Sequence, residues 1–332
     1  MIKNRSEIVF LYDAKDVNPN GDPMDENRPR IDEETGINIV TDVRLKRTVR
    51  DYLHKFKERE IFVREIEYEP GKIQDAKLRA EDFLTKDKER LDKGKIKLAE
   101  MRDVITQNIL DKCIDVRLFG GTIPIEKNTK EKSAITLTGP VQFRIGRSLH
   151  RVEIVHIKGT GAFASEQGKE QKTFRDEYVL PYSLICFYGV INENASKSTH
   201  LAEEDVKLLL DGMWNGTKNL ISRSKVGQMP RLLIRVVYKE KNYHIGDLDK
   251  KIAFKGKIEH EKIRSADDFM LDIDELSETL SEHKEKIERI EYQLSPDLHL
   301  AKNQQQLTMS AFEELLKKDF SVTNLNLEQY SG

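Results

Sequence analysis

The apolar run Glu7–Ile–Val–Phe–Leu–Tyr–Asp–Ala14, followed by the turn-rich segment Asn18–Pro–Asn–Gly–Asp–Pro23, decides the fold of this chain. The first segment is almost continuously apolar, which is typical of a central strand buried on both faces. The second segment belongs to a loop over residues 15–40, whose Asn, Pro and Gly residues disfavour a long helix or strand. The chain therefore begins with a core strand that leads into an irregular, polar connection.

A basic amphipathic helix is predicted directly after this loop. Thr41 is suited to be its N-cap, and Asp42 complements the positive end of the helix. An apolar stripe recurs at helical spacing at Leu45, Val49, Leu53 and Phe56. Acidic residues lie only at the two ends of this helix. We therefore interpret its cations as a phosphate-binding face rather than an ordinary solvated face. These cations are Arg44, Lys46, Arg47 and Arg50.

Composition bounds the class of protein. The chain has 332 residues, of which 34% are charged and 38% hydrophobic, and its net charge is −2. No global positive field attracts a polyanion, so a nucleic-acid site must come from local clusters of cations. Cys113 and Cys186 lie in apolar runs and are expected to be buried thiols rather than a disulfide or a zinc site. The sequence has no signal-peptide pattern and no apolar run of about 18 residues, so we expect a cytoplasmic protein without a membrane partner.

Four further core elements are predicted: a strand over residues 135–145, a strand over 182–191, a helix over 203–221 and a strand over 231–238. With the first strand and helix, they give the order strand, helix, strand, strand, helix, strand. This is the order of the ferredoxin-like fold, which RNA-recognition domains share. The prediction is an α+β protein with an antiparallel sheet and large insertions.

The insertions are charged or irregular. Residues 59–97 are predicted to form a solvated subdomain, followed by a helix over 98–114. Residues 146–176 are rich in Gly, Lys and Arg and are predicted to form a flexible protrusion. The tail after residue 239 is mostly charged, and helices are predicted near 274–292 and 310–318.

The loop after the first strand has three possible roles. Asn20, Arg28 and Arg30 are candidates to grip a sugar–phosphate backbone. Alternatively, Asp22, Asp25 and Asp32 gather a divalent cation for phosphodiester cleavage, because hard cations prefer oxygen ligands. The third possibility is an ordinary turn-rich loop, since Asx residues and Pro favour turns for local reasons.

Two more basic segments are candidate ligand sites. One contains Arg223, Ser224 and Lys225, and it is either a phosphate site or the cationic end of a helix. The other lies in and near the protrusion, where Phe163 either stacks on a base or packs under its own loop. Its cations are Arg144, Arg147 and Lys158. The sequence contains no P-loop, no dinucleotide-binding glycine pattern and no recognisable catalytic triad.

Taken together, these motifs resemble the backbone subunit of CRISPR Cascade complexes, a branch of the RAMP superfamily, and the subtype I-B variant most closely. The resemblance rests on the loop motif Asn18–Pro23, on Arg28–Pro–Arg–Ile–Asp32, on Thr41–Asp–Val–Arg–Leu–Lys–Arg47 and on Arg117–Leu–Phe–Gly–Gly121. It implies a modified RNA-recognition core shaped like a right hand. The implied palm comprises residues 1–58, 133–145 and 177–240, the fingers 59–132 and the thumb 146–176, with a charged helical C-terminal region at 241–332.

The resemblance also implies a function. Several copies bind along one guide crRNA, together with other Cascade subunits, and leave the bases free to pair with target DNA. The helix that contacts the guide matches Lys46, Arg47 and Arg50, the adjoining loop matches Asn20, Arg28 and Arg30, and the wedge of the thumb matches Phe163 loosely. Type I members are not nucleases, so we expect no catalytic residue, metal or cofactor. The alternative is a metal-dependent endoribonuclease that cuts target RNA through a loop aspartate, as in the related type III branch.

Overall fold

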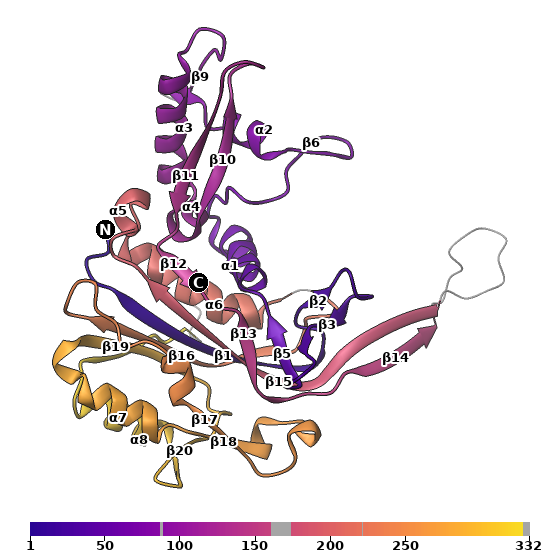
Figure 1. The fold of residues 1–332 in the computed structure, drawn as a ribbon, viewed down its shortest axis with the longest axis vertical. Coiled ribbons are helices and arrows are strands. Elements are labelled where there is room, and N and C mark those ends of the chain that lie inside the picture. Colours follow the sequence, from indigo (N-terminus) through magenta and orange to yellow (C-terminus); the bar gives the residue numbers. More distant parts are fainter. Residues whose placement is uncertain (87–88, 161–173, 221, 328–332) are drawn as a thin grey trace.

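The computed structural model describes residues 1–86, 89–160, 174–220 and 222–327. A large sheet lies at the centre, with helices on one face and the C-terminal region on the other (Figure 1). A finger-like group of elements extends from one side, and a long two-stranded ribbon extends from another (Figure 1). Within the described residues, no helix combines the length and the apolar character needed to cross a membrane.

The central sheet is antiparallel except at one edge, where its last two strands run parallel. Its strands, in spatial order, are β22 (Val322–Asn324), β19 (Ile287–Leu294), β16 (Gln228–Tyr238), β1 (Ser6–Val17), β15 (Phe174–Ile191), β13 (Gly146–Arg151), β5 (Ile37–Val40) and β4 (Ile31–Asp32). Two further strands, β12 (Val141–Phe143) and β14 (Val155–Thr160), pair with different parts of β15. The mixed α+β prediction is therefore correct.

Strand β1 occupies the middle of the sheet, as its apolar sequence predicts. It pairs with β15 on one side and with β16 on the other. Ile8, Phe10 and Tyr12 belong to the apolar cluster under the helices, whereas Val9 and Leu11 belong to the cluster under the C-terminal region. Burial on both faces explains why apolar residues are continuous here instead of alternating with polar ones.

Helices α1 (Asp42–Lys57) and α6 (Glu203–Lys218) pack side by side on one face of the sheet. The Thr41 hydroxyl accepts a hydrogen bond from the Arg44 N–H at 3.3 Å, so the predicted N-cap is correct. Two glycines of α6 allow the close approach. A Cβ at Gly212 or at Gly216 would lie 3.0 Å from a side-chain atom of α1.

The C-terminal region covers the opposite face, and its predicted helical character is only partly correct, because strands make up much of it. It contains α7 (Asp274–Glu282) and α8 (Met309–Lys317), but the helix predicted over 274–292 ends at Glu282. The chain returns as β19 because Ile290, Tyr292 and Leu294 alternate along it and are buried against the sheet. A small second sheet completes this layer, with β17 (Ala253–Gly256), β18 (Phe269–Asp272), β20 (Leu300–Lys302) and β21 (Gln305–Leu307).

The finger-like group has its own apolar cluster. Its elements are α2 (Ala76–Glu81), α3 (Leu98–Lys112), the hairpin β10 (Gly120–Glu126)–β11 (Lys132–Thr138), and the short hairpins β6 (Glu67–Glu69)–β7 (Lys72–Ile73) and β8 (Thr85–Lys86)–β9 (Glu89–Arg90). The single strand predicted over 135–145 is wrong. Strand β11 pairs with β10, whereas β12 joins the central sheet, and the chain changes direction between them at Gly139. A Cβ there would lie 2.1 Å from the Phe119 carbonyl carbon.

The predicted flexible protrusion begins later than expected. Residues 146–151 form β13, where Gly146, Ser148 and His150 are buried in alternation, so this segment belongs to the sheet. The ribbon begins at β14, which pairs with the first part of β15. Short strand pairs, including β2 (Gly21–Asp22) with β3 (Arg28–Pro29), also order the loop after β1. Both cysteines are buried and unpaired, as predicted.

Candidate nucleic-acid interface

Three segments that the sequence places far apart meet at one end of the sheet. The Asn18 N–H donates to the Ser224 carbonyl at 3.0 Å, and Lys225 Nζ donates to the Asn18 carbonyl at 2.9 Å. Asn20 Oδ1 accepts from the N–H and the hydroxyl of Thr41 at 2.8 and 3.0 Å. The loop after β1, the first turn of α1 and the segment before β16 are therefore fixed to one another.

A pocket of about 150 Å³ opens at this junction, between α1 and the end of α6. Arg44 and Lys225 both line it, with the Arg44 guanidinium donating to the Thr48 hydroxyl at 2.9 Å. Asp51 also lines the pocket, but it forms an ion pair with Arg47 at 2.9 Å. Over the described part of the chain, neither Arg44 nor Lys225 has a carboxylate within ion-pair distance.

Electrostatics show that both cations are held in an unfavourable environment. Burial lowers the pKa of the Arg44 guanidinium below its ordinary value, although the charge of Asp51 acts in the opposite sense. Burial, and then the nearby charge of Arg44, lower the pKa of Lys225 to about 8. Two partly buried cations in one pocket favour the binding of an anion there. The donors and the size of the pocket are suited to a phosphate group.

The other predicted cations of α1, namely Lys46, Arg47 and Arg50, are compensated, which contradicts the premise that their charge is in local excess. Lys46 pairs with Asp42 at 2.9 Å, and Arg47 pairs with Asp51. Only Arg47 of this group is largely exposed, at 52% of its side-chain surface. Its guanidinium is accessible to a ligand that displaces or shares Asp51.

Arg50 connects α1 to the finger-like group. Its Nε lies 3.0 Å from Asp115, and the two side chains are 13% and 0% exposed. Asp115 also accepts the backbone N–H groups of Phe62 and Val63 at 2.7 and 3.1 Å. Sequence reasoning did not predict this ion pair, because Asp115 lies far from Arg50 along the chain. Arg50 is therefore committed to a buried structural contact.

The loop cations bind protein groups at the base of the ribbon. Arg28 donates to Glu26 at 3.1 Å and to the Tyr178 hydroxyl at 3.2 Å, and its guanidinium lies over the Tyr178 ring at 4.6 Å. Arg30 pairs with Asp22 at 2.7 Å. Sequence reasoning missed Tyr178, since nothing in its local sequence marks it. These contacts fix the loop against β15, and Arg28 remains partly exposed.

The loop carboxylates face arginines rather than one another. Asp22 accepts from Arg30, and Asp25 lies 4.0 Å from Arg28. Asp32 pairs with Arg147 at 3.2 Å; desolvation opposes its ionisation, but hydrogen bonds from Arg147 and from neighbouring backbone hold the pKa of this carboxyl below its ordinary value. Among the residues that the structure describes, no group of three or more His, Cys, Asp or Glu side chains is arranged to hold a metal ion.

The other candidate residues are dispersed. Arg144 lies over the Tyr188 ring at 4.3 Å and pairs with Asp247, on the sheet face opposite α1. Arg223 pairs with Glu177 at 3.1 Å, and Lys158 lies exposed on β14. Phe163 lies outside the described residues. The structure thus joins Asn20, Arg44, Ser224 and Lys225 and places Arg144 elsewhere.

Comparison with known proteins defines the class. The model of the CRISPR-associated protein Cas7 family matches residues 4–274, and the chain belongs to this family. It is 36% identical over 304 residues to the CRISPR-associated protein Cas7 of Haloferax volcanii, which covers 86% of each protein. A chain of a solved "CRISPR RNA-guided surveillance complex, pre-nicking" has a TM-score of 0.51 at 12% identity, over 95% of this chain and all of that one. A second "CRISPR RNA-guided surveillance complex" chain gives 0.49 at 13% identity, over 87% and 88%.

Proposed function

We propose that this protein is the RNA-binding backbone subunit of a CRISPR Cascade complex, in which several copies bind along one crRNA. The observation that carries the proposal is the pair formed by Arg44 and Lys225. These two partly buried cations lie in a pocket at the junction of three basic or polar segments, and no described carboxylate lies within ion-pair distance of either. Such a pair is suited to a phosphate of the guide backbone. Membership of the Cas7 family supports the same function.

Binding through phosphates and sugars leaves the bases available. Backbone contacts set the position of the guide without reading its sequence, and base pairing then selects the target DNA. The net charge of −2 suits this role. A strongly basic chain would repel its neighbouring copies on the same guide, whereas local cations in an otherwise balanced chain do not.

We further propose that the core is ferredoxin-like. The spatial order β16–β1–β15–β13, with α1 and α6 on one face, supports this topology. In the hand-like division, the palm is this core and the fingers comprise residues 59–132. The ribbon of β14 with the first part of β15 is the base of the thumb, so residues 146–151 belong to the palm instead. The resemblance of the loop motif supports subtype I-B, and we propose a cytoplasmic particle.

A non-catalytic role is part of the proposal. Asp22 and Asp32 are engaged with Arg30 and Arg147, and their hydrogen bonds shape the loop. The alternative, a metal-dependent endoribonuclease, predicts regular cuts in complementary RNA with Mg²⁺ or Mn²⁺ that disappear in Asp22→Ala, Asp25→Ala or Asp32→Ala. We expect no such products from the assembled complex, and their appearance would replace the non-catalytic assignment.

Copurification tests the RNA-binding role. Protein expressed together with its guide is expected to carry RNA, which raises the ratio of absorbance at 260 nm to that at 280 nm. A ratio typical of protein alone, in material that is folded and assembled, would indicate a scaffold that binds no RNA and would contradict the proposal.

A further inference from the structure

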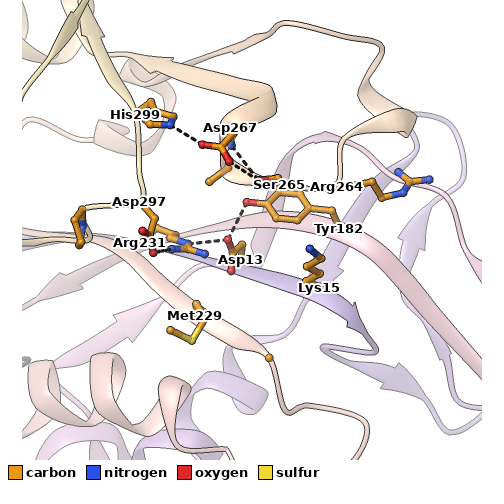
Figure 2. A pocket seen from close by; sticks show the side chains of 13 residues that line it. Asp13, Lys15, Tyr182, Met229, Arg231, Arg264, Ser265, Asp267, Asp297 and His299 are labelled. Atoms are coloured by element: carbon orange, nitrogen blue, oxygen red, sulfur yellow. Dashed lines mark hydrogen bonds and ion pairs between the residues drawn. The ribbon is translucent and has the colours of Figure 1, made fainter.

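A second pocket, of about 360 Å³, lies on the sheet face opposite α1 (Figure 2). Its floor is made by the ends of β1, β15 and β16, through Asp13, Lys15, Tyr182 and Arg231. The C-terminal region supplies the other walls, through residues 264–267 and 296–299.

The pattern of β1 explains why this end of the face is polar. Val9, Leu11, Asp13 and Lys15 alternate along one face of the strand. The first two are buried in the apolar cluster under the C-terminal region, whereas Asp13 and Lys15 line the pocket. This face of β1 thus leaves the apolar core and enters the polar pocket within four residues of Leu11.

All three carboxylates of the pocket are engaged with protein groups. Asp13 Oδ2 accepts from Arg231 Nε at 2.7 Å and from the Tyr182 hydroxyl at 2.9 Å (Figure 2). Asp297 pairs with Arg231 Nη1 at 2.9 Å. Asp267 accepts from His299 at 3.0 Å and from the Ser265 hydroxyl at 3.1 Å. The negative charges are therefore satisfied inside the protein.

Among the described residues, two side-chain cations of the same pocket form no ion pair with a carboxylate. Lys15 is exposed, and no hydrogen bond or ion pair of its side chain occurs in the described structure. The Arg264 guanidinium donates from Nη1 to the carbonyls of Glu261 and Ile263, at 2.6 and 2.8 Å, and its backbone N–H donates to Asp268. Figure 2 shows both side chains among those that line the pocket.

We infer that Lys15 and Arg264 form a second phosphate site, for a nucleic-acid backbone, on the other side of the sheet from Arg44 and Lys225. The segment before β16 borders both pockets, since Lys225 lines the first and Gly227 the second. Gly227 has a φ of +97°, and this turn carries the chain from one pocket to the other. The inference rests on the proposed function, because the phosphate belongs either to the guide or to the target strand.

The test uses the assembled complex with its guide. Lys15→Gln with Arg264→Gln is compared with Lys3→Gln and Lys207→Gln, two exposed lysines that form no ion pair in the described structure. Dissociation constants for guide RNA and for target DNA are measured over a series of salt concentrations. Each lost phosphate contact reduces the log–log salt slope by about 0.7 for a single strand. We expect a reduction of about 1.4 for each bound copy in one arm, and that arm identifies the strand.

Several outcomes would overturn the inference. One is that both slopes equal those of the control variant while melting temperatures remain unchanged. Another is that the assembly of copies is impaired without a change in either slope, since the cations would then bind an acidic protein surface. If wild-type protein binds no guide at all, the proposed function fails first. The two failures are therefore distinguishable.

Discussion

At the scale of single residues, the cations near α1 divide into two kinds. Lys46 and Arg50 form ion pairs that hold the protein together. Arg44 and Lys225 share a pocket without a carboxylate partner among the described residues. The density of cations in the sequence predicts a phosphate-binding face on this helix, but it does not distinguish the two kinds of cation, because the distant partner Asp115 is brought in only by the tertiary fold.

The pH dependence of RNA binding follows from Lys225. Its pKa of about 8 lies below its ordinary value, so the free protein loses this charge as the pH rises through 8, whereas a bound phosphate retains it. Guide affinity is expected to fall by roughly several-fold between pH 7 and 9. The free energy of unfolding of the free protein changes in the opposite sense: it rises as the pH increases from 8 toward the ordinary pKa of lysine. Fluorescence-anisotropy titrations of Lys225→Gln should show a flatter pH profile, and an unchanged profile would exclude Lys225 as a ligand.

A different result is expected for Arg50. Arg50→Ala leaves the Asp115 carboxylate buried without its cation, which costs about 3 kcal/mol or more of folding free energy. Urea unfolding of the free protein measures this loss. The salt slope of guide binding by the remaining folded protein should equal that of wild type. A reduced slope with unchanged stability would instead identify Arg50 as a phosphate ligand.

At the scale of elements, the sequence predicts the helices and strands whose apolar pattern can be recognised from the local sequence. The apolar run of β1 and the helical stripes of α1 and α6 indicate elements that the structure confirms within a few residues. The failures at β11, β13 and β19 have one cause. In each case the role of the segment is set by the strand it pairs with, which local periodicity does not reveal. Strand β11 forms a hairpin with its neighbour β10, whereas β13 and β19 pair with strands that are distant in sequence.

The packing of α1 against α6 makes a prediction about the site. Gly216 lines the Arg44–Lys225 pocket, and a Cβ there would lie 3.0 Å from Tyr52 and 3.2 Å from the Thr48 carbonyl. Gly216→Val is expected to destabilise the protein by about 1–3 kcal/mol and to weaken guide binding, because it forces α1 away from α6. Gly121→Ala, whose added Cβ meets nothing within 4 Å, is the control. Equal unfolding midpoints for the two variants would contradict this account of the helix pair.

At the scale of the whole molecule, the two faces of one sheet have different covers. Helices α1 and α6 cover the face beside the proposed guide site, and the C-terminal region covers the other. Glu7 anchors that region, since its carboxylate accepts from the Tyr188 and Tyr238 hydroxyls and from the N–H groups of Ile245 and Gly246. A net charge near zero describes the total and does not reveal the local excess of cations in the pocket of Arg44 and Lys225.

Loss of the Glu7 carboxylate is expected to destabilise the C-terminal region more than the proposed guide site. Glu7→Leu removes a buried acceptor and leaves four donors unsatisfied, which costs about 3 kcal/mol or more. Hydrogen exchange should show faster exchange over residues 245–300, with the amides of α1 least affected. Uniform acceleration across the chain would indicate that the two layers unfold as one unit.

The central claim is that Arg44 and Lys225 bind guide phosphate. The most direct measurement is the salt dependence of guide binding by Arg44→Ala with Lys225→Ala, beside Lys3→Ala with Lys207→Ala as the matched control. Loss of two phosphate contacts predicts a log–log slope smaller by about 1.4, with folding intact. A slope equal to that of the control variant would contradict the claim.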